Sequence, residues 1–237
     1  FNLYIEREAD TTYPAYSILK SPDKGESWFA VDKLSKKSQS SRRSMSLRNR
    51  TQTEPDNPEN LYIGNLYGLF HSESGGMTTH LQNNKIPNSY IIDLEVHPFN
   101  KDTVYAAGLQ GLWRTNNGGN DWKRIFINPV GFTKFDPQTP DTLYYGGLEL
   151  NRSFDGGDTF QNITGNIGGG LMDMAIHPDS TNILFVHSSP DPYSHLIYKS
   201  TDYGNHWDLV FNSGYNEGVS QVHIDTHHPD TVYFSTH

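Results

Sequence analysis

An eight-residue pattern recurs along this chain and constrains its fold more than any other feature of the sequence. The pattern is Ser/Thr-x-Asp/Asn-x-Gly-x-x-Trp/Phe, and clear copies lie at 21–28 (SPDKGESW), 115–122 (TNNGGNDW), 153–160 (SFDGGDTF) and 200–207 (STDYGNHW). A fifth copy at 72–79, SESGGMTT, keeps the serine and the glycine but has neither the acid nor the aromatic residue. A unit repeated at intervals of 38 to 51 residues predicts a repeat architecture.

Each octet lies within a longer unit that reads as four strands. A strand ending in a basic residue precedes the octet, as in GLWR and LIYK, and a strand with a Pro/Asp-rich lead-in comes earlier, as in NKDTVYAAG and TPDTLYYGG. Before three of these lead-ins stands an alternating strand that ends in His-Pro: IIDLEVHP, LMDMAIHP and VHIDTHHP. We name the four strands A to D in chain order. The pattern predicts that His97, His177 and His228 occupy equivalent turns between strands A and B.

The octet itself predicts a hairpin turn between strands C and D. Its glycine supplies a positive φ, its Asp or Asn accepts hydrogen bonds from turn N–H groups, and its aromatic residue packs between neighbouring sheets. A catalytic or metal-binding role for the acids is the alternative. The residues assigned to these structural turns are Ser21, Asp23, Gly25, Trp28, Thr115, Asn117, Gly119, Trp122, Ser153, Asp155, Gly157, Phe160, Ser200, Asp202, Gly204 and Trp207.

The octets resemble Asp-boxes, also called BNR repeats. These occur in sialidases, sortilin-type domains, xyloglucan-cleaving glycosidases and a photosystem assembly factor. The resemblance implies an all-β protein, in which each repeat forms one four-stranded antiparallel blade of a β-propeller. It covers residues 1–237 as a single region, and it implies little about activity, because one fold carries many functions.

The chain opens and closes on strands of the same type. FNLYIE at 1–6 aligns with ENLYIG at 59–64, and the chain ends in DTVYFSTH, so both termini read as B strands. We interpret the chain as about five blades of a larger propeller that is incomplete at both ends. A native five-bladed ring is the alternative.

Charge and composition exclude several classes of function. The net charge is −9, there is no cysteine, and no apolar stretch is long enough to span a bilayer. Seven of the 18 Lys and Arg lie in 33–50, which leaves eleven against 27 acids elsewhere, a balance of −16 that argues against nucleic-acid binding. We interpret 33–50 as a crossover followed by a poorly matching strand A, SMSLRNR. An exposed insertion that binds an anionic partner is the alternative.

Strand alternation predicts where a ligand would bind. A–B turns and octets share one face of the blades, so the variable B–C loops and D–A crossovers share the other, and variable loops carry function. Polar and aromatic residues on that face include Asp93 and Glu149. The ligand-binding candidates are Arg7, Tyr90, Asp191, Tyr193, His195, Tyr215 and Glu217.

The motifs of enzymes with this repeat are missing from the sequence. The resemblance to sialidases would imply an Arg-Ile-Pro motif, and none is present. The xyloglucan-cleaving relatives would imply RTDVGG, where this chain has RTNNGG with Asn116 and Asn117. We therefore expect a secreted, periplasmic or cell-surface module that binds a carbohydrate or a protein, without cofactor or metal. A glycoside hydrolase fragment that uses paired carboxylates is the alternative.

Overall fold

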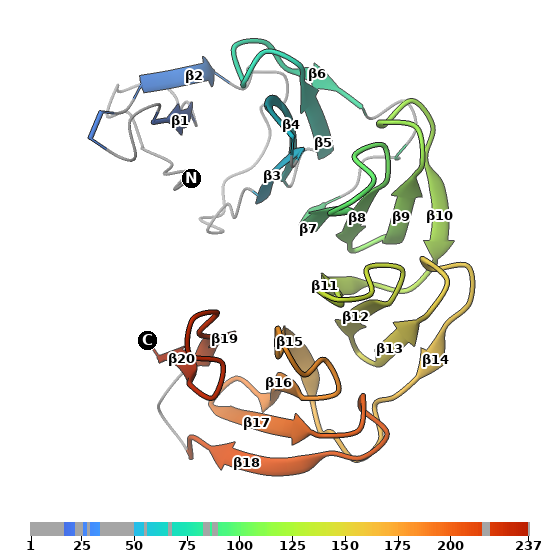
Figure 1. The fold of residues 1–237 in the computed structure, drawn as a ribbon, viewed down its shortest axis with the longest axis vertical. Coiled ribbons are helices and arrows are strands. Elements are labelled where there is room, and N and C mark those ends of the chain that lie inside the picture. Colours follow the sequence, from blue (N-terminus) through green and yellow to red (C-terminus); the bar gives the residue numbers. More distant parts are fainter. Residues whose placement is uncertain are drawn as a thin grey trace.

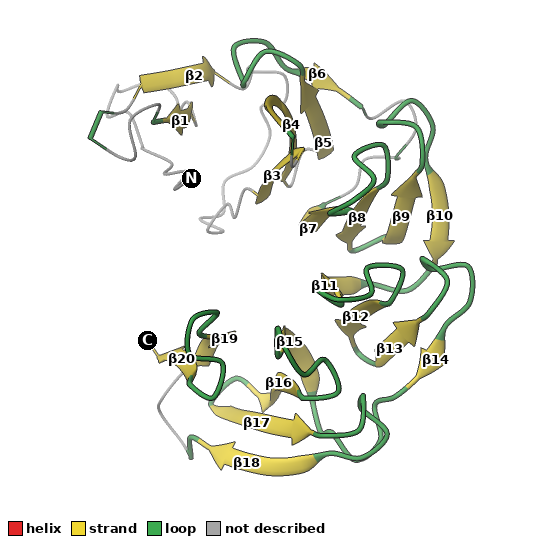
Figure 2. Cartoon of the chain, in the orientation of Figure 1, coloured by secondary structure: helices red, strands yellow, loops and turns green. Residues whose placement is uncertain are grey.

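The chain folds into β-sheets arranged around a common centre. In a computed structural model, the described residues are 17–21, 26–27, 29–33, 50–54, 56–65, 68–82, 86, 90–214 and 219–236. They contain strands and turns but no helix (Figure 2). None of the described residues forms a helix long and apolar enough to cross a membrane. Of the predicted turn residues, Asp23, Gly25 and Trp28 lie outside this described part.

Four of the sheets have four strands and two have two strands. The complete sheets consist of β3 (Arg50–Glu54), β4 (Asn57–Asn65), β5 (Gly68–Ser72) and β6 (His80–Leu81); β7 (Ile91–Val96), β8 (Val104–Gly108), β9 (Gly111–Thr115) and β10 (Lys123–Phe126); β11 (Val130–Phe135), β12 (Leu143–Gly147), β13 (Leu150–Ser153) and β14 (Gln161–Asn162); and β15 (Gly170–Ile176), β16 (Leu184–Asp191), β17 (Ser194–Ser200) and β18 (Asp208–Asn212). The two-stranded sheets pair β1 (Ser17–Lys20) with β2 (Phe29–Lys33) and β19 (Val219–Ile224) with β20 (Val232–Thr236).

Within each complete sheet, consecutive strands are neighbours and run antiparallel. The A strands β3, β7, β11, β15 and β19 line the centre, and the D strands lie outside (Figure 1). This arrangement confirms the predicted β-propeller of four-stranded antiparallel blades. The register is the same in every complete sheet, because the first octet residue pairs with the same B-strand position: Leu61 with Ser72, Val104 with Thr115, Leu143 with Ser153 and Leu184 with Ser200.

Two expectations about strand A have different outcomes. The described A strand of the β3 sheet is Arg50–Glu54, which includes Arg50 of the predicted strand SMSLRNR, and the rest of that prediction falls on residues 34–49, outside the described part. His228 does not take the turn position of His97 and His177. In those turns the histidine Nδ1 accepts N–H bonds from the residues two and three positions later, whereas in the β19–β20 turn Asp225 Oδ1 does so. The His-Pro dipeptide does not mark the equivalent position in this turn. The residue that accepts the turn N–H groups is defined by its position relative to the strand rather than by the proline.

The octet turns are closed by the side chain of their first residue. Ser153 Oγ accepts hydrogen bonds from the N–H groups of Asp155 (3.2 Å) and Gly157 (2.7 Å) and donates to Asp155 Oδ1 (2.7 Å). Thr115 and Ser200 make the same three contacts in their own octets. The fifth octet residue needs glycine, since Gly157 has a φ of 89°.

The acid of the octet fixes the second half of the turn. Asp155 Oδ1 accepts the N–H of Thr159 at 2.8 Å, and its Oδ2 accepts the hydroxyl of Thr159 at 2.6 Å. These bonds to Thr159 favour the carboxylate and hold the pKa of Asp155 well below its usual range. In the 72–79 copy, which lacks the acid, Ser74 Oγ accepts the N–H of Thr78 at 2.9 Å instead. A hydroxyl therefore preserves the turn where the carboxylate is missing.

The octets at 153–160 and 200–207 are also held by the preceding blade. Arg114, at the end of strand β9, donates from Nη1 to the Gly156 carbonyl (2.5 Å) and from Nη2 to Asp158 Oδ1 (2.7 Å). Tyr105 donates to the same carbonyl at 2.6 Å. Arg152 repeats the contact one blade later, to the Tyr203 carbonyl at 2.5 Å. Two of the basic residues that recur before the octets, Arg114 and Arg152, thus bind the octet of the next blade.

Aromatic octet residues pack at the same boundaries between neighbouring blades. Trp207 is 1% exposed, packs in the hydrophobic core beside Ile163 and Tyr144 of the preceding sheet, and donates Nε1–H to the Ile163 carbonyl at 2.8 Å. Burying a side chain of this size contributes about 2–3 kcal/mol. The octet therefore joins neighbouring blades as well as closing its own hairpin.

Ser153→Ala should lower the free energy of unfolding by about 1–3 kcal/mol, because the buried N–H of Gly157 loses its acceptor. Urea unfolding monitored by tryptophan fluorescence measures the change. Ser180→Ala is the matched control, since the Ser180 hydroxyl lies outside the octets. An equal loss of stability in both variants would contradict this account of the turn.

Candidate functional site

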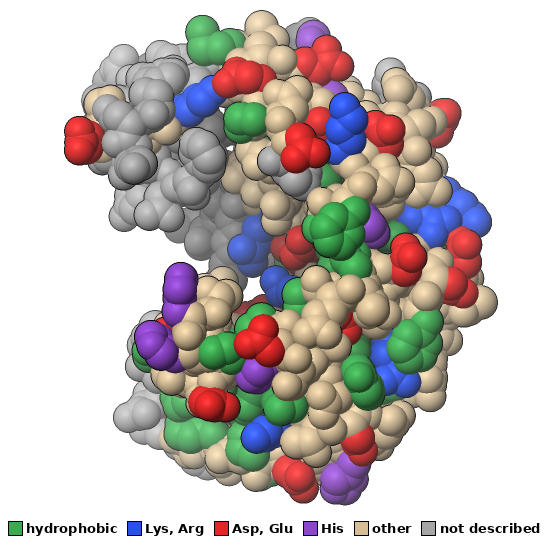
Figure 3. Space-filling model, in the orientation of Figure 1, with side chains coloured by type: hydrophobic (Ala, Val, Ile, Leu, Met, Phe, Trp, Pro, Cys, Tyr) green, Lys and Arg blue, Asp and Glu red, His purple; other side chains and the backbone are tan. Residues whose placement is uncertain are grey.

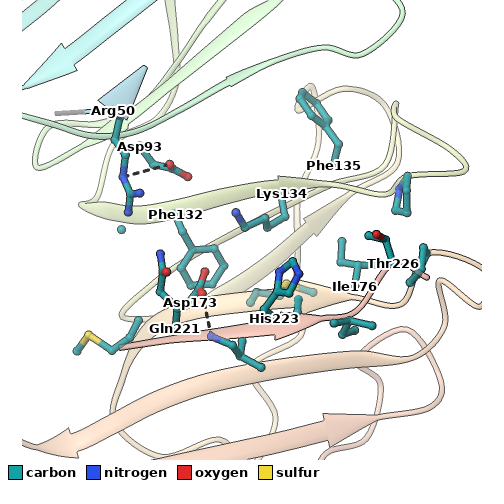
Figure 4. A pocket seen from close by; sticks show the side chains of 18 residues that line it. Arg50, Asp93, Phe132, Lys134, Phe135, Asp173, Ile176, Gln221, His223 and Thr226 are labelled. Atoms are coloured by element: carbon teal, nitrogen blue, oxygen red, sulfur yellow. Dashed lines mark hydrogen bonds and ion pairs between the residues drawn. The ribbon is translucent and has the colours of Figure 1, made fainter. Parts of the chain in front are cut away.

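A cavity of about 470 Å³ lies among the inner strands at the centre of the propeller. In the space-filling view the molecule is hollowed at its centre, with basic and acidic side chains close together on the wall (Figure 3). Polar side chains enter it from five A strands (Figure 4): Arg50, Asp93, Lys134, Asp173, Gln221 and His223. Phe132, Phe135, Met172 and Ile176 provide apolar lining. This volume is within the range of small-ligand sites.

The repeat register places these residues at two levels along the inner strands around the cavity. Counted back from the A–B turn, Arg50, Asp93, Phe132, Asp173 and Gln221 share one position of their strands. Two residues later, on the same strand face, stand Glu95, Lys134, Ala175 and His223. A register shift before the first level, at Asp93, Phe132, Asp173 and Gln221, marks a bulge in each of these strands.

The two aspartates tie neighbouring inner strands together. Asp93 Oδ2 accepts the N–H of Thr133 at 2.9 Å, and Asp173 Oδ2 accepts the N–H of Val222 at 3.1 Å. Thr133 and Val222 occupy the same position in β11 and β19. Each carboxylate therefore supplies an acceptor for a main-chain N–H on the edge of an inner strand, a group that would otherwise lack a hydrogen-bond partner.

Positively and negatively charged side chains alternate around the cavity. Arg50 Nε lies 3.1 Å from the Ile92 carbonyl and 3.8 Å from Asp93 Oδ1. Lys134 Nζ lies 3.7 Å from Glu95 Oε1. Burial opposes the charge on Lys134, but the attraction of Glu95, Asp93 and Asp173 outweighs it and raises the lysine pKa. The cavity wall is thus a set of paired charges rather than a field of one sign.

Burial raises the pKa values of the inner carboxyl groups, whereas the octet acids at the surface have lowered pKa values. Loss of water raises the pKa of Asp93 and raises that of Glu95 to about 7, although Lys134 pulls both down. The Glu95 side chain is 20% exposed. Near neutral pH, Glu95 therefore exchanges its proton beside Lys134 of the cavity wall.

These shifts predict the pH dependence of stability. At Glu95 the folded protein binds more protons than the unfolded chain between the ordinary glutamate pKa and about 7, so the contribution of Glu95 to the free energy of unfolding should fall as pH rises through this window, opposite in sign to the contribution of His187. Glu95→Gln should reduce that fall by on the order of 1–3 kcal/mol. Urea unfolding from pH 4.5 to 8 measures it, with the exposed Glu149→Gln as control. Equal slopes for wild type and Glu95→Gln would refute the assignment.

The predicted ligand-binding residues lie away from this cavity. Among the described ones, Tyr90 precedes β7, and Asp191, Tyr193 and His195 meet at the β16–β17 hairpin. There Asp191 Oδ1 accepts the N–H of Tyr193 at 2.9 Å, and the Tyr193 ring is 61% exposed. None of these four lines the cavity. Arg7, Tyr215 and Glu217 lie outside the described residues.

His195 has an unexpected partner. Its Nδ1 lies 2.9 Å from Nε2 of His187, a buried residue of β16. Burial, followed by the effect of His195, lowers the pKa of His187 to about 4. The pair is therefore uncharged at His187 near neutral pH and links two strands of one sheet.

Sequence reasoning missed most of the cavity residues. Arg50, Lys134, Asp173, Gln221 and His223 were not predicted as candidates, and Asp93 was assigned to the loop face. A signal was present: Asp93 and Asp173 both stand four residues before the His of His-Pro. An expectation that loops carry function does not include this pattern, because it lies on the inner faces of strands.

Comparisons with known proteins bear on the fold. No protein-family model matches the chain, and no curated protein matches it by sequence. Among solved structures, it is similar to the GH74 xyloglucanase from Xanthomonas campestris (TM-score 0.74, 13% identity, 99% of this chain and 41% of that chain). It is also similar to an ancestral GH74 enzyme (TM-score 0.71, 20% identity, 90% of this chain and 31% of that chain). A third similar structure is YCF48 from Cyanidioschyzon merolae (TM-score 0.59, 14% identity, 89% of this chain and 69% of that chain).

The chain spans less than half the length of the two GH74 enzymes. At these identities the likeness concerns the fold alone. The strand order, the repeated register and the three structural similarities together establish that this chain is built of β-propeller blades.

Proposed function

We propose that this protein is a non-catalytic binding module that takes a carbohydrate or a segment of a protein. The observation that carries the proposal is the central cavity of about 470 Å³, with polar side chains from five inner strands and aromatic rings on its wall. A concave site with apolar surface and a few directed polar groups is the usual form of a binding site.

The charges on the wall favour a neutral, polar ligand. Arg50 and Lys134 already lie beside Asp93 and Glu95, so both cations of the described wall are already paired with a carboxylate. Gln221 and His223 are exposed and supply further polar groups. Hydroxyl groups of a sugar or amides of a peptide both donate and accept hydrogen bonds, which matches such a mixed wall.

Binding is favoured over catalysis because the cavity aspartates have structural partners. Asp93 and Asp173 each accept a main-chain N–H from the next inner strand. Moving a proton to either carboxylate would weaken the joint between two blades. The proposal includes a location outside the cytoplasm, as the octet resemblance implies, and a supporting role for the exposed Tyr193 on the loop face.

A glycoside hydrolase is the second candidate, and one observation favours it. Two carboxyl groups, Asp93 and Asp173, line one cavity, and burial raises the pKa of Asp93 as an acid catalyst requires. Turnover of chromogenic glycosides that disappears in Asp173→Asn, while binding persists, would support this candidate.

A glycan array and a peptide library, each probed with the purified chain, test the proposed binding. For a ligand found in either screen, His223→Ala should weaken binding by about 1–2 kcal/mol in calorimetric titration, because its imidazole lines the cavity. His206→Ala is the matched control, an exposed histidine on an octet.

The same titration locates the site. Unchanged affinity in His223→Ala, with a loss in Tyr193→Ala, would move the ligand to the loop face. Hydrolysis of the bound glycan would overturn the non-catalytic assignment.

A further inference from the structure

The octet turns at 153–160 and 200–207 belong to neighbouring blades and lie between β13 and β14 and between β17 and β18 (Figure 1). Arg152 joins them: its Nη1 donates to the Tyr203 carbonyl at 2.5 Å, and its Nη2 donates to Gln161 Oε1 at 3.1 Å. One blade earlier, Arg114 makes the equivalent contact with the Gly156 carbonyl. The two boundaries share one design, so residues that differ between them point to a role beyond the fold.

Tyr203 is the first difference. It is the only residue other than glycine with a positive φ, 60°, in the described part of the chain. The same position in the three other octets that are described there is Gly75 (61°), Gly118 (63°) and Gly156 (62°). A side chain at this φ costs free energy that glycine does not. A tyrosine kept at such a position, and 43% exposed, indicates a use for its ring.

Phe154 is the second difference. It is 60% exposed, and its ring centroid lies 4.4 Å from Cζ of Arg152. The octet at 115–122 has Asn116 at this position. Arg152 is only 5% exposed and is held by its two hydrogen bonds, so the Phe154 ring rests on a fixed support. An exposed ring that is already immobilised loses little entropy when a ligand stacks on it.

The third difference is one of charge. Arg114 pairs with Asp158 Oδ1 at 2.7 Å, whereas the residue equivalent to Asp158 in the next octet is Asn205. Among the described residues, no carboxylate forms an ion pair with Arg152, and Arg152 Nε is buried without a hydrogen-bond partner. The Phe154 ring therefore provides a stabilising contact to this guanidinium that a carboxylate provides one blade earlier.

The two exposed rings lie at the same boundary. At Gly156, the equivalent of Tyr203, an added Cβ would lie 3.8 Å from Arg114 Nη1. By the same geometry, the Tyr203 side chain begins beside Arg152, whose guanidinium Phe154 covers. Neither ring lines the central cavity.

We propose that Phe154 and Tyr203 form a stacking platform for a neutral carbohydrate on the face of the propeller that carries the octets. The charges around the rings select a neutral ligand. A cation stacked on Phe154 would face Arg152 through the ring. An anion would face Asp155 and Asp202, which stay ionised because hydrogen bonds within their turns lower their pKa values.

A sugar ring matches the remaining surface. Its C–H face packs on an aromatic ring, and its hydroxyl groups donate and accept hydrogen bonds. The amides of Gln161, Asn182 and Asn205 border the two octets, and amide groups also donate and accept. A proline-rich peptide also carries flat apolar rings, but it has no hydroxyl groups to pair with these amides.

Three neutral β-linked hexasaccharides, of glucose, N-acetylglucosamine and mannose, are the probes. At least one should bind the full chain saturably in saturation-transfer NMR, with the strongest transfer to ring C–H protons. Phe154→Asn and Tyr203→Gly each introduce the residue found at the equivalent position of the 115–122 octet, so both variants should fold. Each should weaken binding by about tenfold or more, because a stacked ring is lost. The melting temperature of Tyr203→Gly should be unchanged or higher, because the positive φ no longer carries a side chain.

Controls separate this platform from other surfaces. Phe99→Ala, which removes a 79% exposed residue of an A–B turn, should leave binding unchanged, as should His223→Ala in the cavity. Binding by none of the three sugars, or unchanged affinity in Phe154→Asn or Tyr203→Gly, would overturn the proposal. A loss in His223→Ala instead would overturn it by placing the sugar in the cavity. Decaproline that binds in place of the sugars, and no longer binds Phe154→Asn, would overturn it by making a peptide the occupant.

Discussion

At two joints, hydrogen bonds from one blade to an octet carbonyl of the next hold neighbouring blades together. Arg114 and Tyr105 converge on Gly156, and Arg152 reaches Tyr203. A hydrogen bond from a charged donor is stronger than one from a neutral donor, and its geometry is specific. Because each bond crosses a joint, the same residue that ends strand C also sets the spacing between blades. The octet is therefore a connector between blades as much as a turn.

The inner strands make a second set of joints with different chemistry. There, Asp93 and Asp173 bridge neighbouring strands, and Lys134 stands among three carboxylates. The two sets differ in their exposure to water. Octet acids at the surface have lowered pKa values because N–H and hydroxyl donors stabilise the carboxylate, whereas inner acids have raised values because burial removes water. Near neutral pH, the contribution of the acids to the pH response should therefore originate at the centre rather than at the octets.

Much of the fold could be predicted from local pattern. The order of the strands, the octet turn and the joint role of its aromatic residue follow from spacing and turn chemistry, and these depend on residues close in sequence. The turn histidine was harder to assign. His97 and Asp225 do the same work with a ring nitrogen and a carboxylate, so position in the strand matters more than residue type. Ser74 replaces an acid in the same way.

The sequence by itself determined the blade: four strands, a turn that needs glycine, and a basic residue before each octet. Only the tertiary structure decided which side chains meet across blades. Arg50, Asp93, Lys134 and Asp173 lie on four different A strands, and they face one cavity because the strands are arranged around a common centre. Local propensity specifies each repeat, whereas contacts between distant repeats depend on how the blades pack.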